Sequence, residues 1–185
     1  MNDRFPTTSD ELIAAVAADL DAKLVYLVGD ATKPIKPEAS GPILICHVSN
    51  DVRAWGAGFT AALDRAYPGI GALFSGEPRK LGDVHVVEVG GLETGPLFVV
   101  NMVAQHGLVG PGNPHPLDYG ALAECMRKVA GIALGLSNEP GVFPATIHCP
   151  RFGSGLAGGK WETIEAGIKT VWVKSGIDVY VYDLA

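Results

Sequence analysis

Near the C-terminus, a run of glycines has the residue types and spacing of a phosphate-binding loop. Gly153-Ser-Gly155-Leu-Ala-Gly158 matches the pattern G-x-G-x-x-G, and Gly159-Lys160 follows it directly. Such loops bring backbone N–H groups close to phosphate oxygens, and a following helix adds its positive N-terminal dipole. Each glycine costs up to ~1 kcal/mol in conformational entropy relative to alanine. This cost favours a loop that binds a ligand over the alternative, a simple tight turn. The sequence therefore predicts an anion site here.

Two well-known glycine loops fit this stretch only in part. The P-loop needs glycine where Ser154 stands and a hydroxyl side chain where Trp161 stands, so its magnesium ligand is missing. A dinucleotide-binding loop fits better, because strand, loop, helix and strand follow in order and Asp183 ends the second strand as a ribose-binding acid would. A single β-α-β unit at the end of the chain leaves no room for the second half of that fold. An NAD(P) oxidoreductase is therefore a remote alternative.

The composition argues against several other classes of protein. A net charge of −6 disfavours direct nucleic-acid binding and binding to an anionic membrane surface, which both need basic patches. The sequence has no apolar run long enough for a membrane span, and its polar N-terminus lacks a secretory apolar region. Three cysteines, far apart and odd in number, make no disulfide framework, and five histidines show no metal-ligand spacing. We therefore expect a cytoplasmic protein without a metal or a bound cofactor.

The pattern of apolar runs and breakers predicts one α/β domain over residues 1–185. Pro42–Val48 is almost continuously apolar, which is typical of a strand buried on both faces. The runs Asp83–Val89 and Leu97–Val103 have a short connection, which predicts an antiparallel hairpin. Alternation of strands and helices favours a sandwich with a mixed sheet. Further strands are expected at Leu24–Val28, Ala145–Cys149 and Ile177–Asp183, and helices at Ser9–Asp21, at Phe59–Ala66, from Pro68, from Leu117 to about Leu136, and at Lys160–Lys174.

Another glycine loop, the first in chain order, indicates the family. His47-Val-Ser-Asn50-Asp51-Val-Arg-Ala-Trp55-Gly56-Ala57-Gly58-Phe59 follows the buried strand and leads into a helix. Together with Tyr26-Leu-Val-Gly29-Asp30, Cys149-Pro-Arg-Phe-Gly-Ser-Gly155 and Val179-Tyr-Val-Tyr-Asp183, this ordered set resembles a macrodomain. It is most similar to the branch of the terminal ADP-ribose protein glycohydrolase and the yeast-type ADP-ribose-1''-phosphate phosphatase. The resemblance begins near Leu24 and leaves residues 1–23 as an extra N-terminal helical segment.

The resemblance implies a three-layer α/β/α sandwich with a central mixed sheet, whose cleft holds ADP-ribose or an ADP-ribosylated macromolecule. The family's aspartate that accepts from the adenine amine corresponds to Asp30, and its asparagine at the distal ribose corresponds to Asn50, whose amide both donates and accepts. The second glycine loop in chain order, with Phe152–Leu156, corresponds to the diphosphate clamp. The implied ligand-binding residues are Asp30, Ala31, Asn50, Trp55, Gly56, Ala57, Gly58, Gln105, Phe152, Gly153, Ser154, Gly155, Leu156 and Asp183.

The sequence departs from the catalytic patterns of these relatives. The glycohydrolase branch uses a lysine at the end of the hairpin strand and an aspartate in the second loop, and those places align with Ala104 and Ala157. Another hydrolase branch carries an aspartate near the place of Thr60. Because alanine supplies neither an amine nor a carboxylate, hydrolysis would need a water positioned by loop N–H groups. The candidate catalytic residues are Asn50 and Asp51, which would orient water with Gln105 and His106, and His47, which matches a histidine of the phosphatase-like relatives.

The residues and the resemblance together lead to one expected function and two alternatives. We expect an ADP-ribose-binding macrodomain that hydrolyses ADP-ribosyl linkages or ADP-ribose-1''-phosphate. A non-catalytic ADP-ribose reader is the main alternative, because the lysine–aspartate pair is absent. The NAD(P) oxidoreductase belongs to a different class and would prefer NAD to ADP-ribose.

Overall fold

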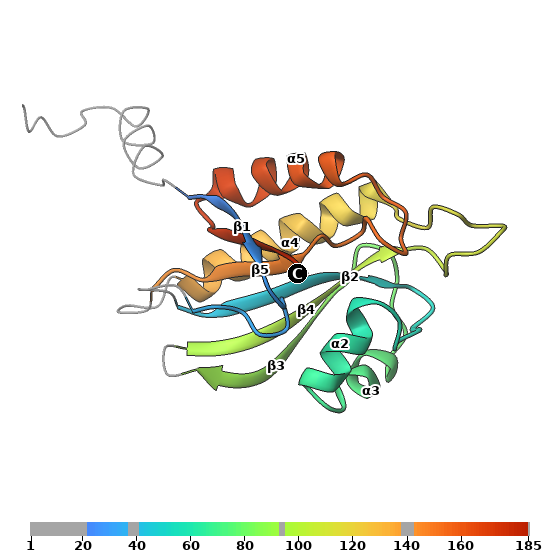
Figure 1. The fold of residues 1–185 in the computed structure, drawn as a ribbon, viewed down its shortest axis with the longest axis horizontal. Coiled ribbons are helices and arrows are strands. Elements are labelled where there is room, and N and C mark those ends of the chain that lie inside the picture. Colours follow the sequence, from blue (N-terminus) through green and yellow to red (C-terminus); the bar gives the residue numbers. More distant parts are fainter. Residues whose placement is uncertain (1–21, 37–40, 93–94, 138–142, 185) are drawn as a thin grey trace, which may run out of the picture.

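The computed structural model describes residues 22–36, 41–92, 95–137 and 143–184, which are coloured in Figure 1. The helix expected over Ser9–Asp21 lies outside these residues. Within them, six strands form one sheet in the order β1-β6-β5-β2-β4-β3. β3 and β4 are antiparallel, as the predicted hairpin requires, and every other neighbouring pair is parallel. The strands are β1 (Leu24–Val28), β2 (Ile43–Asn50), β3 (Val84–Leu92), β4 (Gly95–Gln105), β5 (Thr146–Pro150) and β6 (Val179–Asp183).

Helices cover both faces of this sheet and give the three layers seen in Figure 1. On one face lie α2 (Phe59–Ala66) and α3 (Ile70–Ser75), and on the other lie α4 (Tyr119–Ser137) and α5 (Trp161–Val171). The predicted α/β/α sandwich with a central mixed sheet is thereby confirmed. In the part of the chain that the structure describes, no helix is long and apolar enough to cross a membrane.

The alternation of side chains along β2 divides the core into two parts. Leu44 and Cys46 belong to the larger cluster under α4 and α5. Ile43 and Ile45 belong to a smaller cluster, where they meet Leu63 of α2 and a residue of α3. Because both faces of β2 are buried, its sequence has to be apolar almost throughout, which is the pattern from which the strand was predicted.

Several helix boundaries differ from the prediction for local reasons. α3 begins at Ile70 rather than at Pro68, because Gly69 before it has a left-handed φ of 92°. α4 begins at Tyr119 rather than at Leu117, because the Asp118 carboxylate caps the helix by accepting the N–H of Ala121 at 2.8 Å. The helix expected over Lys160–Lys174 ends as α-helix at Val171. The chain then forms a short 3-10 helix, Val173–Ser175, before Gly176 stops it with a φ of 82°.

Candidate functional site

A gap in the sheet opens at the carboxyl ends of its parallel strands. β2 and β5 pair only where Ile43–Ile45 lie beside Thr146–His148, and beyond this point the two strands share no ladder. The direction in which the chain adds strands to the sheet also reverses here. β4 and then β3 lie on one side of β2, whereas β5 and then β6 lie on the other. Open α/β sheets bind ligands at such switch points. Both glycine loops leave the sheet at this edge, directly after β2 and β5.

A cavity of about 540 Å³ occupies this gap, a size that suits a small organic ligand. Both glycine loops, the start of α2 and the segment after β4 form its wall. Among the described residues, none that lines the cavity is an aspartate or a glutamate. The lining residues are His47–Asn50, Ala54, Trp55, Ala57–Thr60, Gln105, Leu108, Val109, Pro150–Gly153 and Gly155–Ala157.

The second glycine loop has backbone N–H groups that the chain itself does not use. The loop is closed by Gly158 and Gly159, whose N–H groups donate to the carbonyls of Gly155 (2.9 Å) and Gly153 (2.8 Å). Within the described residues, the N–H groups from Gly153 to Ala157 donate to no acceptor. Gly153 has a φ of 73°, a left-handed conformation that glycine adopts without steric cost. The loop is thus a fixed turn with a series of free donors at the cavity.

The first glycine loop is different, because side chains already satisfy much of its backbone. The Asn50 amide accepts the N–H of Ala54 and donates to the Ala54 carbonyl, both at 2.8 Å. The Thr60 hydroxyl accepts the N–H groups of Gly56 (3.0 Å) and Ala57 (3.1 Å) and donates to the Ala57 carbonyl. Asn50 therefore holds the turn as well as lining the cavity, and its amide keeps one N–H and one lone pair for a ligand.

Aromatic side chains form the wall under the first loop. The His47 ring lies edge-on to Trp55, with ring centroids 5.9 Å apart, and 5.6 Å from the ring of Phe59. Trp55 in turn packs on Phe74 and on Gly71 of α3, where a Cβ atom would lie only 2.5 Å from the indole Cδ1. The absence of a side chain at Gly71 therefore allows Trp55 to take its place at the cavity.

His47 is buried, and each of its ring nitrogens faces an oxygen acceptor. Asn101 donates its Nδ2 to the His85 carbonyl at 3.3 Å, so its Oδ1 faces His47 Nε2 at 2.7 Å. Nδ1 also faces an acceptor, the Val48 carbonyl at 3.2 Å, and the neutral ring has one N–H and donates to only one of the two oxygens. Burial lowers the pKa of His47 to about 4. At neutral pH this histidine is therefore an uncharged part of the wall and has no proton to give as an imidazolium acid.

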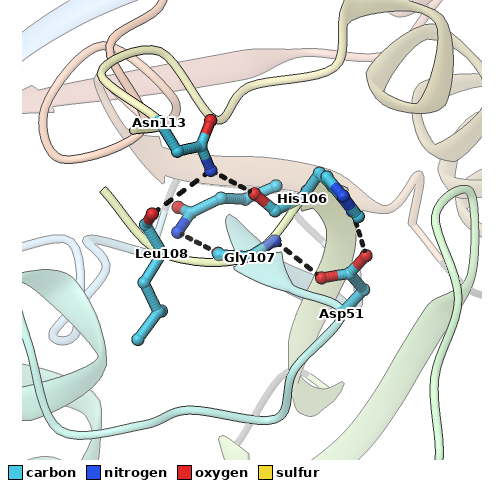
Figure 2. Close-up of polar contacts among 6 residues, drawn as sticks. Asp51, His106, Gly107, Leu108 and Asn113 are labelled. Carbon is cyan, nitrogen blue, oxygen red and sulfur yellow. Dashed lines mark hydrogen bonds and ion pairs between the residues drawn. The ribbon is translucent and has the colours of Figure 1, made fainter. Parts of the chain in front are cut away.

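Asp51 lies just outside the cavity wall and binds the segment that follows β4 (Figure 2). Its Oδ1 accepts the N–H of Gly107 at 2.8 Å, and its Oδ2 lies 2.7 Å from His106 Nδ1. Burial alone would raise the pKa of Asp51, but the hydrogen bonds from Gly107 and His106 outweigh it and lower the pKa. Asp51 is therefore ionised and engaged by two donors, and its expected role in orienting a water stays a prediction.

At the β1 end of the site, Asp30 and Ala31 also lie outside the cavity wall. Asp30 Oδ1 accepts the backbone N–H (2.9 Å) and the hydroxyl (2.8 Å) of Thr32, which fixes the turn after β1. Its second oxygen accepts no hydrogen bond from the described residues. Ala31 is buried and packs with Tyr180 and Tyr182 of β6. One carboxylate oxygen at this end therefore stays available as an acceptor.

Arg151 uses both carboxylate oxygens of Asp183 at the end of β6. Its Nε lies 2.5 Å from Oδ1 and its Nη2 lies 2.7 Å from Oδ2, and this pairing lowers the pKa of Asp183. The guanidinium also lies 5.2 Å from the ring centroid of Tyr26 and 5.3 Å from that of Trp161, within cation–π range. Arg151 lines the cavity and Asp183 does not, so Asp183 is paired with the arginine outside the wall, and its implied role in ligand binding stays a prediction.

The structure brings together part of the expected set of site residues. The cavity is lined by His47, Asn50, Trp55, Ala57, Gly58, Gln105, Phe152, Gly153, Gly155 and Leu156, whereas Asp30, Ala31, Asp51, Gly56, Ser154 and Asp183 are not in its wall. Their expected roles in ligand binding and catalysis stay predictions. In the described ranges, no three His, Cys, Asp or Glu side chains gather as they would around a metal ion.

The sequence interpretation missed several residues of the wall, and Ser49 is the most informative of them. Its side chain is 3% exposed, and its Oγ has no hydrogen-bond partner among the described residues. A buried hydroxyl without a partner costs about 1–3 kcal/mol, which a bound ligand could offset. The alternation of side chains along β2 would have predicted Ser49, because it lies two residues after His47 on the same face.

Comparison with known proteins gives the family. No protein-family model matches the sequence. A macrodomain protein from Streptomyces coelicolor is 33% identical, with a TM-score of 0.70, over 87% of this chain and 99% of that one. A Bacteroides thetaiotaomicron protein of unknown function is 36% identical, with a TM-score of 0.74, over 88% of this chain and 99% of that one. The chain therefore belongs to the macrodomain family.

A more distant structure shares the fold and contains a ligand. Thermosipho africanus DarTG in complex with ADP-ribose is 13% identical, with a TM-score of 0.63, over 90% of this chain. This chain covers 42% of the DarTG chain, so the likeness concerns one part of that protein. The particular branch of macrodomains to which this sequence was assigned stays a prediction.

Replacing Gly71 by alanine tests the packing of Trp55 at the cavity. The new methyl group would overlap the indole, so we expect Gly71→Ala to lower the free energy of unfolding in urea by about 1–3 kcal/mol. Gly131→Ala is the matched control, because Gly131 is a helical glycine of α4 with open space around its Cβ position. It should stabilise the protein by about 0.5–1 kcal/mol. Equal stabilisation by both variants would contradict the packing described here.

Proposed function

We propose that the chain binds ADP-ribose in this cavity, with the diphosphate against the second glycine loop. The observation that carries the proposal is the series of backbone N–H groups from Gly153 to Ala157, which find no acceptor in the described chain. Phosphate oxygens are the acceptors that such a series favours. Membership of the macrodomain family and the ADP-ribose in the DarTG complex support the same ligand.

The charge around the cavity agrees with a diphosphate ligand. The chain carries a net charge of −6, which would repel a dianion from most of its surface. The described wall nevertheless contains no carboxylate, and its Arg151 is positively charged. Of the carboxylates outside the wall, Asp51 is engaged by Gly107 and His106 and Asp183 by Arg151, while Asp30 keeps one oxygen free at the proposed adenine end. The lining of the cavity is thus compatible with an anionic ligand.

Free acceptors and donors suggest how ADP-ribose lies in the site. The second oxygen of Asp30 would accept from the adenine amine at the β1 and β6 end, as the family resemblance implies. The distal ribose would then lie at the β2 and β4 end. There Asn50 keeps one free N–H and one lone pair, and the Gln105 Nε2 donates to the Gly107 carbonyl at 2.9 Å, which leaves its Oε1 free. Both amides would bind ribose hydroxyls.

Hydrolysis at the distal ribose would use the ligand's own phosphate. Ala104 is buried in the core cluster under α4, and Gln105 is the cavity-facing residue at the end of β4, so no amine is present there. Water held between the diphosphate and the anomeric carbon would attack C1'' and pass its proton to a phosphate oxygen. The leaving group would take a proton from solvent. Positioning alone can supply several kcal/mol of the acceleration. The substrates would be ADP-ribosylated macromolecules of the cytoplasm or ADP-ribose-1''-phosphate.

Gly155→Asp tests the binding site directly. Gly155 has open space around its Cβ position and no left-handed φ, so the aspartate should fit the free protein. Its charge would meet the diphosphate, and two like charges near 4 Å repel by about 4 kcal/mol at a protein surface, so ADP-ribose affinity should fall at least ~100-fold by isothermal titration. Gly91→Asp is the control, because Gly91 of β3 is equally open and lies beside Pro96 at the start of β4, at the opposite edge of the sheet. Unchanged affinity in Gly155→Asp would contradict the proposed diphosphate site.

Release of ADP-ribose distinguishes a hydrolase from a reader. Wild-type protein should release ADP-ribose from at least one of three substrates: ester-linked, glycoside-linked or the 1''-phosphate. Liquid chromatography measures the ADP-ribose that is released. Asn50→Ala removes the amide at the distal ribose and should slow this release ~100-fold. Tight ADP-ribose binding without release from any substrate would establish a reader instead. Tighter binding of NAD than of ADP-ribose would favour an oxidoreductase, although the observed strand order is not that of the Rossmann fold.

A further inference from the structure

The segment 105–113 forms the β4 side of the cavity and is held there by polar contacts. Leu108 and Val109 line the cavity although their side chains are 53% and 46% exposed. Burial of apolar surface therefore contributes little to their position. Figure 2 shows Leu108 pointing away from the Asp51 and His106 side chains, with Gly107 between them. Something other than the core has to fix this part of the backbone.

Two side chains hold the segment from opposite sides. Asp51 accepts the Gly107 N–H at 2.8 Å and pairs with His106 Nδ1 at 2.7 Å. Asn113 donates its Nδ2 to the carbonyls of His106 (2.8 Å) and Leu108 (3.2 Å), as Figure 2 shows. We call these contacts of Asp51 and Asn113 with residues 106–108 the clasp. The clasp fixes the backbone on both sides of Gly107, and with it the cavity-lining side chains at either end.

Chain topology places the clasp at one particular end of the site. Asp51 directly follows β2, and its backbone N–H donates to the carbonyl of Gln105, the last residue of β4, at 3.0 Å. A one-residue shift in register at this point sets Asn50 opposite Gln105. In the strand order, β2 and β4 lie on the far side of β5 from β6 and β1. The clasp thus joins the ends of two strands that lie on the side of β5 away from the proposed adenine position.

From this geometry we infer that Asp51 is a positioning residue for the distal ribose and does not itself touch the ligand. This inference rests on the proposed function, because it assigns a role within the ADP-ribose site. By fixing Gly107, Asp51 keeps the Gln105 amide and the Leu108 and Val109 side chains at the sugar end of the cavity. It therefore contributes to affinity for ADP-ribose beyond the affinity for ADP, which lacks the distal ribose.

The chemistry of the clasp also predicts which substitution restores it. A carboxylate accepts two bonds, one from the backbone N–H of Gly107 and one from His106. In Asp51→Asn the amide oxygen can still accept from Gly107, while its N–H₂ donates to the His106 ring in the other tautomer. Asp51→Ala loses both bonds. A role as a base, or in holding a catalytic water through the negative charge, would be lost in both variants.

Isothermal titration of ADP-ribose and ADP against wild type, Asp51→Ala and Asp51→Asn tests the inference. Asp51→Ala should weaken ADP-ribose roughly tenfold and leave ADP within about twofold, because only ADP-ribose reaches the clasped segment. Asp51→Asn should keep ADP-ribose within about threefold of wild type. Glu88→Ala, on the exposed side of β3, is the matched loss of one negative charge and should change neither ligand.

The outcomes separate the inference from the proposed function. If wild type binds neither ligand, the ADP-ribose site itself is refuted, and the clasp role falls with it. If wild type binds ADP-ribose but Asp51→Ala weakens both ligands equally, or neither, the positioning role is refuted while the site stands. Hydrogen exchange of the Gly107 amide gives a second measurement without ligand. It should be protected in wild type and Asp51→Asn and fast in Asp51→Ala, and equal protection in all three would overturn the inference.

Discussion

The account depends on the separation of two parallel strands. β2 and β5 are hydrogen-bonded at their start and part beyond Ile45 and His148, so the carboxyl edge of the sheet has a gap that no third strand fills. Backbone polar groups at such a gap need partners from outside the sheet. The two loops at the gap differ in how these backbone groups are satisfied. The loop after β2 is satisfied by its own Asn50 and Thr60 side chains, and the loop after β5 leaves its donors free.

This difference between the two loops affects the chemistry that the site can perform. The side chains with catalytic potential, His47, Asn50 and Asp51, all make hydrogen bonds within the protein that hold a strand or a loop in place. Among the described residues, the groups that remain free at the cavity are the backbone N–H groups of the second loop, the Ser49 hydroxyl, the Trp55 Nε1–H and parts of the Asn50 and Gln105 amides. Such a site stabilises and orients a phosphate-bearing ligand very well. Any bond cleavage would then depend on positioning of the ligand and water more than on an acid–base pair.

Local patterns predicted the fold, and long-range contacts decided the rest of the site. β2 was recognised because burial on both faces requires continuous apolar residues, and the loops were recognised because close approach requires glycine. The roles of Asp51 and Asp183 could not be read in the same way. Their partners, Gly107 and Arg151, are distant in sequence and meet them only through the sheet order. Asp118 shows the opposite case, since its capping of α4 is a local signal that was available.

A crystal structure of the protein with ADP-ribose would test the central claim most directly. We predict phosphate oxygens within about 3 Å of the backbone nitrogens between Gly153 and Ala157, with adenine toward Asp30 and the distal ribose beside Gln105. A diphosphate that touches none of these nitrogens, or an adenine bound at the Gln105 end, would contradict the account.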